Sequence, residues 1–205
     1  MLAAEFVNKG KAFRAVFFAT ADSGAGGYYA PNGESMRKAF LRSPLEFSRV
    51  SSRFGTRRHP LFNNWRAHTG VDYAAPTGTR IRATGDGVVE FAGRKGGYGN
   101  AVILRHGGQK TTLYAHLNHF ARGIHRGVRV AQGETIGAVG STGWATGPHV
   151  HYEFRIAGVP RNPLTIALPA AHPVPAAQMA AFRSHTAEFV AQLDLLSSTN
   201  LALLQ

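Results

Sequence analysis

The feature that most constrains this chain is a series of short β-type runs, separated by glycine-rich turns, that extends from residue 48 to about residue 166. The runs read "GVVEFAG", "NAVILRHG", "TTLYAHL", "ETIGAVG" and "HVHYEFRI". The last of them alternates strictly between polar and apolar residues, which is typical of a strand with one buried face. No long helical pattern interrupts the series. The segment therefore predicts a mainly β fold built on an antiparallel sheet.

The flanking segments have a different character. Residues 1–30 predict two or three short strands, too few to close a core, and residues 31–47 predict a turn and then a short helical stretch. We expect three parts in the chain: a C-terminal remnant of an upstream β-rich domain at 1–46, the main domain at 47–168, and a Pro-rich linker with a helix at 169–205.

The C-terminal segment predicts an amphipathic helix that starts near Pro175. Its apolar residues recur at spacings of three, four and seven, which is a helical period. These residues are Met179, Phe182, Phe189, Leu193 and Leu196.

Composition excludes several kinds of site. The chain of 205 residues has no cysteine, which excludes disulfides, thiol catalysis and Cys-ligated zinc, so any metal must use His, Asp or Glu. No apolar run reaches the roughly 18 residues of a membrane span. The first 20 residues do not read as a signal peptide. We therefore expect either a cytoplasmic protein or one whose targeting segment or membrane anchor lies outside this chain.

The net charge of +12 favours an anionic partner. Nucleic acid, anionic lipid and an acidic wall polymer all fit this charge. Basic and aromatic residues do not interleave into a stacking platform, and no nucleic-acid-binding motif is present, so we do not expect nucleic acid as a partner.

The stretch "GPHVHYEF" places His149 and His151 two residues apart on a predicted strand. Residues i and i+2 leave the same face of a strand, about 7 Å apart at the backbone. Such a pair can bind a metal, or one imidazole can bind it while the other transfers protons. Two ordinary surface histidines beside a turn would have the same spacing, and the pair alone does not decide.

A second stretch, "HTGVD", adds His68 and Asp72. Together with the pair His149 and His151, this stretch offers two histidines and one aspartate as three protein ligands. Such a set leaves a fourth tetrahedral position open, as in catalytic zinc sites. The motif H-E-x-x-H, whose glutamate acts as a general base, is missing. Another group must therefore accept the proton of a metal-bound water. His116, in "TLYAHLNHF", is a candidate because it continues the polar alternation of its predicted strand. An ordinary strand-face histidine is the competing interpretation.

Four blocks in this order resemble the lysostaphin/LytM-type zinc endopeptidases of bacterial cell walls: "HTGVDYAAPTGTRIRATGDGVV", "YGNAVILRHG", "TTLYAHL" and "GSTGWATGPHVHYEF". The resemblance covers roughly residues 47–166. The flanks "GGYYAPNGESMRKAFLRSPLEFSRVSSRFGTRRHP" and "VPRNPLTIALP" resemble the Gram-negative murein DD-endopeptidase branch, whose members usually carry further domains and an N-terminal anchor or signal. A regulatory domain upstream is therefore a possible partner of this chain.

The resemblance implies a role for each of these residues. His68, Asp72 and His151 would bind Zn²⁺, and His116 and His149 would be the catalytic pair. The implied activity is hydrolysis of peptidoglycan cross-links between stem peptides, from D-Ala to meso-diaminopimelate, in the periplasm or cell envelope of a Gram-negative bacterium. The alternative is a non-catalytic or autoinhibited peptidoglycan-binding module that activates another wall hydrolase.

The other histidines carry no metal spacing, and a structural role is expected for most of them. His106, at a strand end in "LRHG", is the one most favoured to line the cleft. Arg66 and Asn64 are further candidates for the groove.

Overall fold

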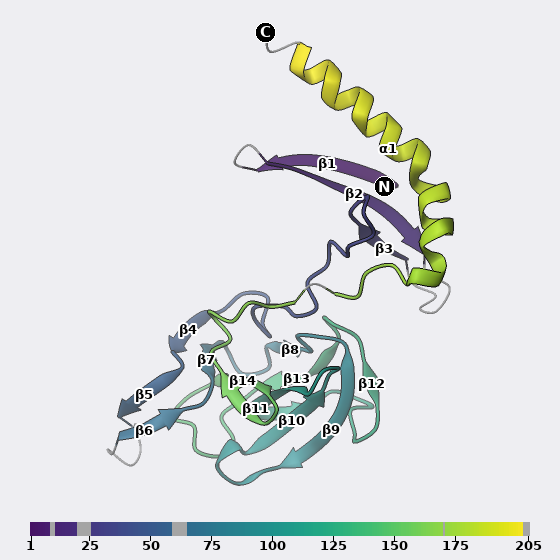
Figure 1. Cartoon of the computed structure of the whole chain (residues 1–205). Helices are drawn as coiled ribbons and strands as arrows, with labels where there is room; N and C mark the ends of the chain where they lie inside the picture. The colour runs from purple at the N-terminus through teal and green to yellow at the C-terminus, as the bar shows by residue number, and fades with distance from the viewer. Residues whose placement is uncertain (9–10, 20–25, 59–64, 170, 203–205) are drawn as a thin grey trace. The chain divides into compact units, whose positions relative to one another are not determined.

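We analysed a computed structural model, which describes residues 1–8, 11–19, 26–58, 65–169 and 171–202. The chain forms two compact units (Figure 1). The terminal unit comprises Met1–Ala39 and Leu168–Gln205, and the sheet unit comprises Phe40–Ala167. The assignment of residues 1–46 to a domain that begins upstream stays a prediction.

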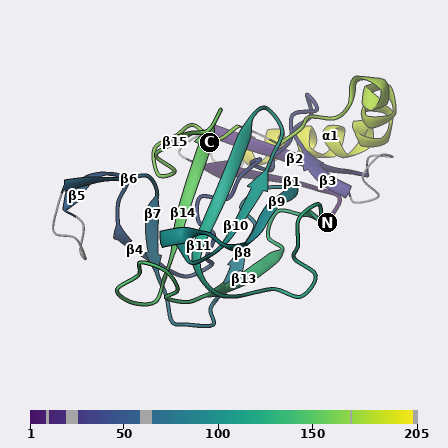
Figure 2. The ribbon, with the colours of Figure 1, turned by 90° about the horizontal axis from the view of Figure 1, so that it is seen from below.

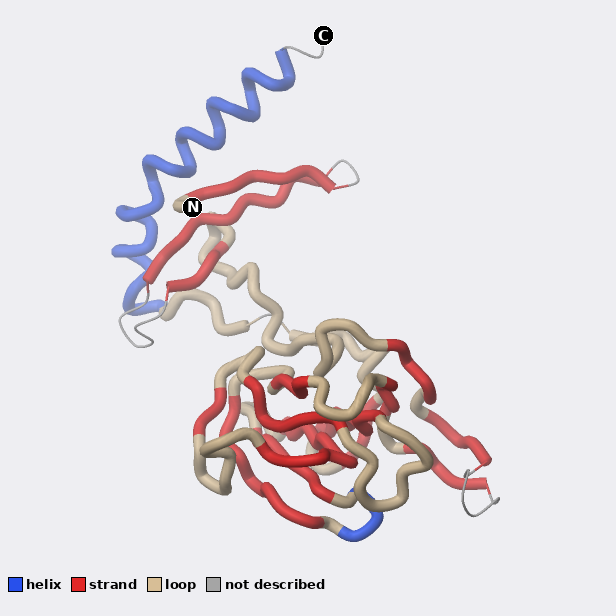
Figure 3. The backbone as a smooth tube through the Cα atoms, turned by 180° about the vertical axis from the view of Figure 1, so that it is seen from behind, coloured by secondary structure: helices blue, strands red, loops and turns tan. Residues whose placement is uncertain are grey.

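The sheet unit contains a ten-stranded antiparallel sheet, which confirms the predicted fold class. Hydrogen-bonded neighbours follow the order β12-β9-β10-β11-β14-β7-β4, and β13, β15 and β8 join off this path. The strands are β4 (Arg49–Ser52), β7 (Val71–Ala74), β8 (Arg80–Arg82), β9 (Gly87–Arg94), β10 (Asn100–Arg105), β11 (Lys110–Phe120), β12 (Arg129–Val130), β13 (Thr135–Val139), β14 (His149–Ile156) and β15 (Val159–Arg161). A separate hairpin pairs β5 (Gly55–Arg58) with β6 (Trp65–His68), and the 3-10 turn η1 spans Gly96–Tyr98. Strands and loops make up most of this unit (Figure 3).

Strand β14 shows how the alternating sequence positions a site. Tyr152 is 1% exposed in the main hydrophobic core on one face of the sheet. His151 and Glu153 leave from the other face, as the period of two requires. β14 lies between β11 and β7 (Figure 2), so His151 pairs with Ala115 on one side and with Asp72 on the other. The H-x-H motif therefore lies inside the sheet and not at its edge.

Residues 31–47 contain no helix, so the predicted short helical stretch is wrong. From Leu41 on, this segment instead contacts the rest of the sheet unit. The N–H of Leu41 donates to the carbonyl of Thr84 at 2.6 Å. Leu45 is 1% exposed in the main core. Pro44, which lacks an N–H, also disfavours a helix here. Tertiary pairing and packing replace the local hydrogen bonds that a helix would make.

The terminal unit contains a three-stranded antiparallel sheet and the predicted C-terminal helix. Its elements are β1 (Ala3–Asn8), β2 (Lys11–Ala19), β3 (Gly26–Tyr29), the 3-10 turn η2 (Ala176–Gln178) and α1 (Met179–Ala202). Phe182 of α1 is fully buried, and its ring meets Phe18 of β2 edge to face at 5.3 Å. Among the described residues, no helix combines the length and the apolar character that a membrane span requires.

One residue of the predicted apolar stripe faces solvent. Leu196 is 61% exposed, so its assignment to the buried face of α1 is wrong. Polar side chains make the contacts at this end of the helix: Asp194 pairs with Arg14 of β2, and Ser197 donates to the carboxylate of Glu5 in β1 at 2.7 Å. The apolar spacing alone could not indicate that the packed face becomes polar here.

Candidate metal centre

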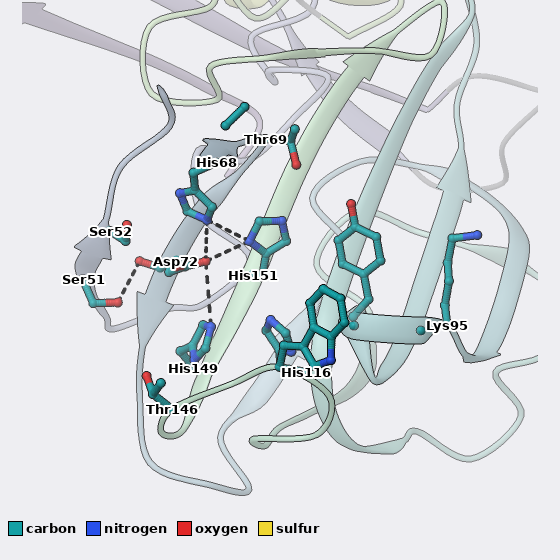
Figure 4. A pocket seen from close by; sticks show the side chains of 15 residues that line it. Ser51, Ser52, His68, Thr69, Asp72, Lys95, His116, Thr146, His149 and His151 are labelled. Carbon is teal, nitrogen blue, oxygen red and sulfur yellow. Dashed lines mark hydrogen bonds and ion pairs between the residues drawn. The ribbon is translucent and has the colours of Figure 1, made fainter. Parts of the chain in front are cut away.

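Three predicted ligands from three strands meet in the sheet unit (Figure 4). His68 ends β6, Asp72 lies in β7 and His151 lies in β14. Gly70 allows this approach, because a Cβ at that position would lie 2.5 Å from the carbonyl oxygen of Tyr152 and 2.7 Å from Cε1 of His151. The turn between the first two ligands can therefore pass beside β14 only with glycine at this point.

The three ligand atoms lie close enough to share one ion. Nε2 of His68 is 3.0 Å from Oδ1 of Asp72 and 3.0 Å from Nδ1 of His151, and the last two atoms are 2.8 Å apart. All three residues are buried. Imidazole nitrogen and carboxylate oxygen are ligands that zinc prefers, and this group is arranged to hold a metal ion.

The outer ring nitrogens support this interpretation. Nδ1 of His68 donates to the carbonyl of Arg53 at 2.7 Å, and Nε2 of His151 donates to Oε1 of Glu153 at 2.9 Å. Both acceptors lack protons, so each neutral imidazole carries its proton on the outer nitrogen and a lone pair on the inner one. Two nitrogen lone pairs and one carboxylate oxygen then point at the same place. Such a set requires positive charge at its centre, and the residues present therefore fit a bound cation.

The electrostatics of the group point the same way. Burial alone would raise the pKa of Asp72, but hydrogen bonds from His151 and His68 hold it well below its ordinary value. Burial alone would lower the pKa of His151, but its hydrogen bonds with Asp72 and Glu153 raise it. A cation is thus favoured at this point, and a proton can occupy it when no metal does.

The second pair of histidines lies beside the first group. The rings of His116 and His149 are 4.7 Å apart, and Nε2 of His149 is 3.8 Å from Oδ1 of Asp72. Nδ1 of His116 donates to the carbonyl of Thr142 at 2.7 Å, and Nδ1 of His149 donates to the carbonyl of Gly147 at 2.8 Å. Each neutral ring therefore keeps a bare Nε2. Burial, together with the neighbouring imidazoles, lowers the pKa of His116 to about 4.

His116 reaches this position through a β-bulge. By simple alternation it would follow Tyr114 into the main core, while Ala115 would face the same side as His151. The pairing of β11 with β10 shifts by one residue between Tyr114 and Leu117. At the shift His116 adopts a left-handed backbone with φ 63°. The expectation that His116 continues the alternation of its strand is therefore wrong, and the bulge turns its side chain toward the metal group.

A cavity of about 750 Å³ opens over the five residues. Its walls include Lys95, Tyr98 and Trp144, and Trp144 is 50% exposed. None of these residues was predicted to belong to the site, although Tyr98 lies in "YGN" and Trp144 in "STGW", within the blocks that carry the resemblance. Only their position next to the motifs could have indicated these residues in the sequence, because their residue types pointed to no particular chemistry.

Glu153 is a further residue of the site that was not predicted from the sequence. Its side chain is 0% exposed and lies on the same strand face as His151. Burial alone would raise its pKa, but hydrogen bonds from His151 and Thr69 lower the pKa to about 2. Glu153 follows His151 at the same spacing of two at which His151 follows His149, so the alternation of the strand could have identified it.

Three further residues were considered for the cleft: His106, Arg66 and Asn64. His106 is buried elsewhere, where Nδ1 donates to the carbonyl of Asp86 at 2.7 Å and Nε2 lies 2.8 Å from the Thr112 hydroxyl. His106 therefore does not line the cavity of the candidate site, and it has the structural role expected for most of these histidines. Asn64 and the side chain of Arg66 lie outside the described part of the chain.

The sequence of this chain is similar to the sequences of known proteins. Residues 66–163 match Peptidase family M23. ShyC of Vibrio cholerae serotype O1, named a peptidoglycan DD-endopeptidase, is 49% identical over 172 residues, which are 83% of this chain and 38% of ShyC. This chain thus spans well under half of that relative.

Two solved structures share the fold. A zinc-containing peptidase from Vibrio cholerae is 30% identical with a TM-score of 0.61, over 82% of this chain and 51% of that one. The catalytic domain of the prophage-encoded M23 protein EnpA from Enterococcus faecalis, crystallised as a variant, is 35% identical with a TM-score of 0.53, over 61% of this chain and 97% of that domain. The matched segment contains all five residues of the candidate site, and the chain belongs to peptidase family M23.

Proposed function

We propose that this protein is a zinc-dependent endopeptidase that hydrolyses peptide cross-links of peptidoglycan, between D-Ala and meso-diaminopimelate. The observation that carries the proposal is the convergence of the bare nitrogens of His68 and His151 with the carboxylate of Asp72, 2.8–3.0 Å apart, at the floor of an open cavity. Family membership and the name of ShyC support the reaction and the polymer.

His68, Asp72 and His151 would hold the zinc. When bound, zinc supplies Lewis acidity, which polarises a peptide carbonyl and lowers the pKa of water toward 7. Three protein ligands suit this chemistry, because a fourth position is left for the reactants. The carbonyl of Arg53 accepts from Nδ1 of His68 at 2.7 Å and so orients the ring of that ligand.

His116 and His149 would carry the proton. Each presents a bare Nε2 toward the cavity, so each can accept a proton from an attacking water and later donate it to the leaving amine. The low pKa of His116 keeps that ring neutral near pH 7, so the lone pair of its Nε2 is available for a proton. Once either ring has accepted the proton, its Nε2–H can donate to the tetrahedral oxyanion.

The substrate assignment is consistent with charge and place. A net charge of +12 suits a polyanionic wall polymer, and the proposed substrate would locate the protein in the periplasm or cell envelope. The cavity is open to solvent at the half-exposed Trp144, so a peptide that belongs to a large polymer can enter it.

One digestion tests the proposal. The purified chain, loaded with zinc, is incubated with diaminopimelate-type sacculi, and the muropeptides are analysed by mass spectrometry. We expect cross-linked dimers to become monomers, with no conversion in the presence of a chelator or in the His151→Ala variant. A folded, zinc-loaded wild type that leaves all dimers intact would contradict the proposal and would favour a module that binds the wall or activates another hydrolase.

A further inference from the structure

The metal group lies against a buried carboxylate that takes no part in the proposed reaction. Glu153 is 0% exposed, and its two oxygens are used differently. Oε2 accepts from the guanidinium of Arg155, at 2.6 Å from Nε and 2.5 Å from Nη2. Oε1 accepts from His151 Nε2 at 2.9 Å, from the Thr69 hydroxyl at 2.6 Å and from the Tyr98 hydroxyl at 2.8 Å.

A plain ion pair does not explain this arrangement. Arg155 alone would neutralise the carboxylate through Oε2, and Oε1 could then have been left to one neutral donor. Instead Oε1 gathers three donors, of which Thr69 and Tyr98 have no charge and hold the oxygen in place. The third donor is the ring of a metal-ligand residue. The network thus fixes one oxygen atom where it faces Nε2 of His151.

The fixed oxygen determines which ring nitrogen of His151 carries the proton. An ionised carboxylate only accepts hydrogen bonds, so Nε2 must be the N–H and Nδ1 must keep its lone pair. Nδ1 is the nitrogen that faces Asp72 at 2.8 Å and His68 at 3.0 Å. A carboxylate behind a ligating histidine also increases the basicity of the ligating nitrogen.

We propose that Glu153 is a positioning residue for metal binding, which holds His151 in the tautomer whose Nδ1 is free to bind the ion. The inference rests on the proposed zinc site and adds a residue outside the His-Asp-His group. Thr69 and Tyr98 act through the same oxygen, and both line the cavity, so the wall of the cavity and the metal ligand share one hydrogen-bond network.

The Glu153→Gln variant tests this role because it changes little in volume. Glutamine has one oxygen and one NH₂. If the oxygen faces His151, the NH₂ faces the guanidinium of Arg155, donor against donor. If the amide turns over, the NH₂ faces Nε2, and the proton of His151 must move to Nδ1, which blocks the metal. We expect zinc affinity, measured by competition with a chromophoric chelator, to fall about 10- to 100-fold.

A matched control separates positioning from stability. Thr112 is also buried and hydrogen-bonded on a neighbouring strand, but its partners are His106 and Tyr114 and none of the site residues. The Thr112→Val variant should lower the melting temperature of the metal-free protein and leave zinc affinity within two-fold of wild type. Unchanged zinc affinity in folded Glu153→Gln would overturn the proposal.

A measurement on the wild type covers the case in which Glu153→Gln does not fold. Nitrogen-15 NMR of the zinc-loaded chain should show a proton on Nε2 of His151 that exchanges slowly with water, and no proton on Nδ1. A rapidly exchanging or absent Nε2 proton would contradict the proposal. These readouts need no turnover: a chain that binds zinc as expected but leaves sacculi intact would contradict the proposed function alone.

Discussion

At the scale of single residues, His116 shows how the fold changes the protonation of a buried imidazole. It is 7% exposed, and its backbone lies in the left-handed region at φ 63°. Burial is the main reason that its pKa falls to about 4, well below the ordinary value of 6.5. A ring held neutral in this way links the stability of the fold to pH.

Acid destabilises the folded chain through the protonation of His116. In the unfolded chain His116 takes up a proton near pH 6.5, whereas in the folded chain it does so only near pH 4, so acid favours the unfolded state. The stability held at neutral pH is lost progressively as the pH falls through this window. Between pH 7.5 and pH 5 we expect the free energy of unfolding of the metal-free wild type to fall by about 2 kcal/mol more than that of His116→Asn.

Asparagine suits this test because it tolerates the left-handed backbone of the site. Denaturant unfolding at the two pH values provides the measurement. His125→Asn, at an exposed loop position, is the control and should follow the wild type. Parallel pH dependence of the wild type and His116→Asn would show that burial does not depress the pKa of this ring.

At the scale of elements, two loops lock together beside the cavity. Gly143 has φ 75°, and a Cβ on it would lie 2.4 Å from the carbonyl oxygen of Gly97 in η1. The carbonyl of the neighbouring Thr142 accepts the hydrogen bond from the ring nitrogen Nδ1 of His116. The close glycine contact therefore helps to determine where the ring of His116 is held.

The Gly143→Ala substitution should lower the catalytic rate by more than its loss of folding stability accounts for. The new methyl group collides with backbone, so the loop must shift and carry the Thr142 carbonyl with it. We expect kcat on soluble cross-linked muropeptides to fall about 100-fold, as misplacement by about 1 Å commonly does. Gly133→Ala is the control, because Gly133 has φ 88° but no atom within 4 Å of its added Cβ. It should lose about 1 kcal/mol of stability and keep its kcat, and equal kcat losses in both variants would refute the loop argument.

The elements also show which parts of the structure the sequence could predict. Alternation and glycine turns predicted five strands of the sheet unit, namely β9, β10, β11, β13 and β14, and the spacing of His149 and His151 predicted their common face. The bulge at His116 was not predictable, because it depends on one extra residue in a strand pairing that only the folded sheet defines. The helix expected within 31–47 failed for a related reason: contacts distant in sequence, such as Leu41 with Thr84, determine that segment.

At the scale of the whole molecule, charge is divided unevenly. The sheet unit carries 17 Lys and Arg against 6 Asp and Glu, whereas the terminal unit carries 6 against 5. Nearly all of the excess positive charge therefore belongs to the unit that holds the candidate site. If the polymer is polyanionic, this unit should account for the long-range attraction to it, and the attraction should weaken with salt.

Binding to sacculi should therefore depend on salt and on the unit that is mutated. In sedimentation with intact sacculi, we expect the bound fraction of chelator-treated protein to fall several-fold between about 50 mM and 500 mM salt, because the Debye length shortens about three-fold. Arg122→Glu with Arg126→Glu reverses two exposed charges in the sheet unit and should weaken binding at low salt. Lys11→Glu with Arg183→Glu makes the same change at exposed positions of the terminal unit and should weaken it less. Equal losses in the two double variants would show that total charge governs binding and that its concentration around the candidate site does not.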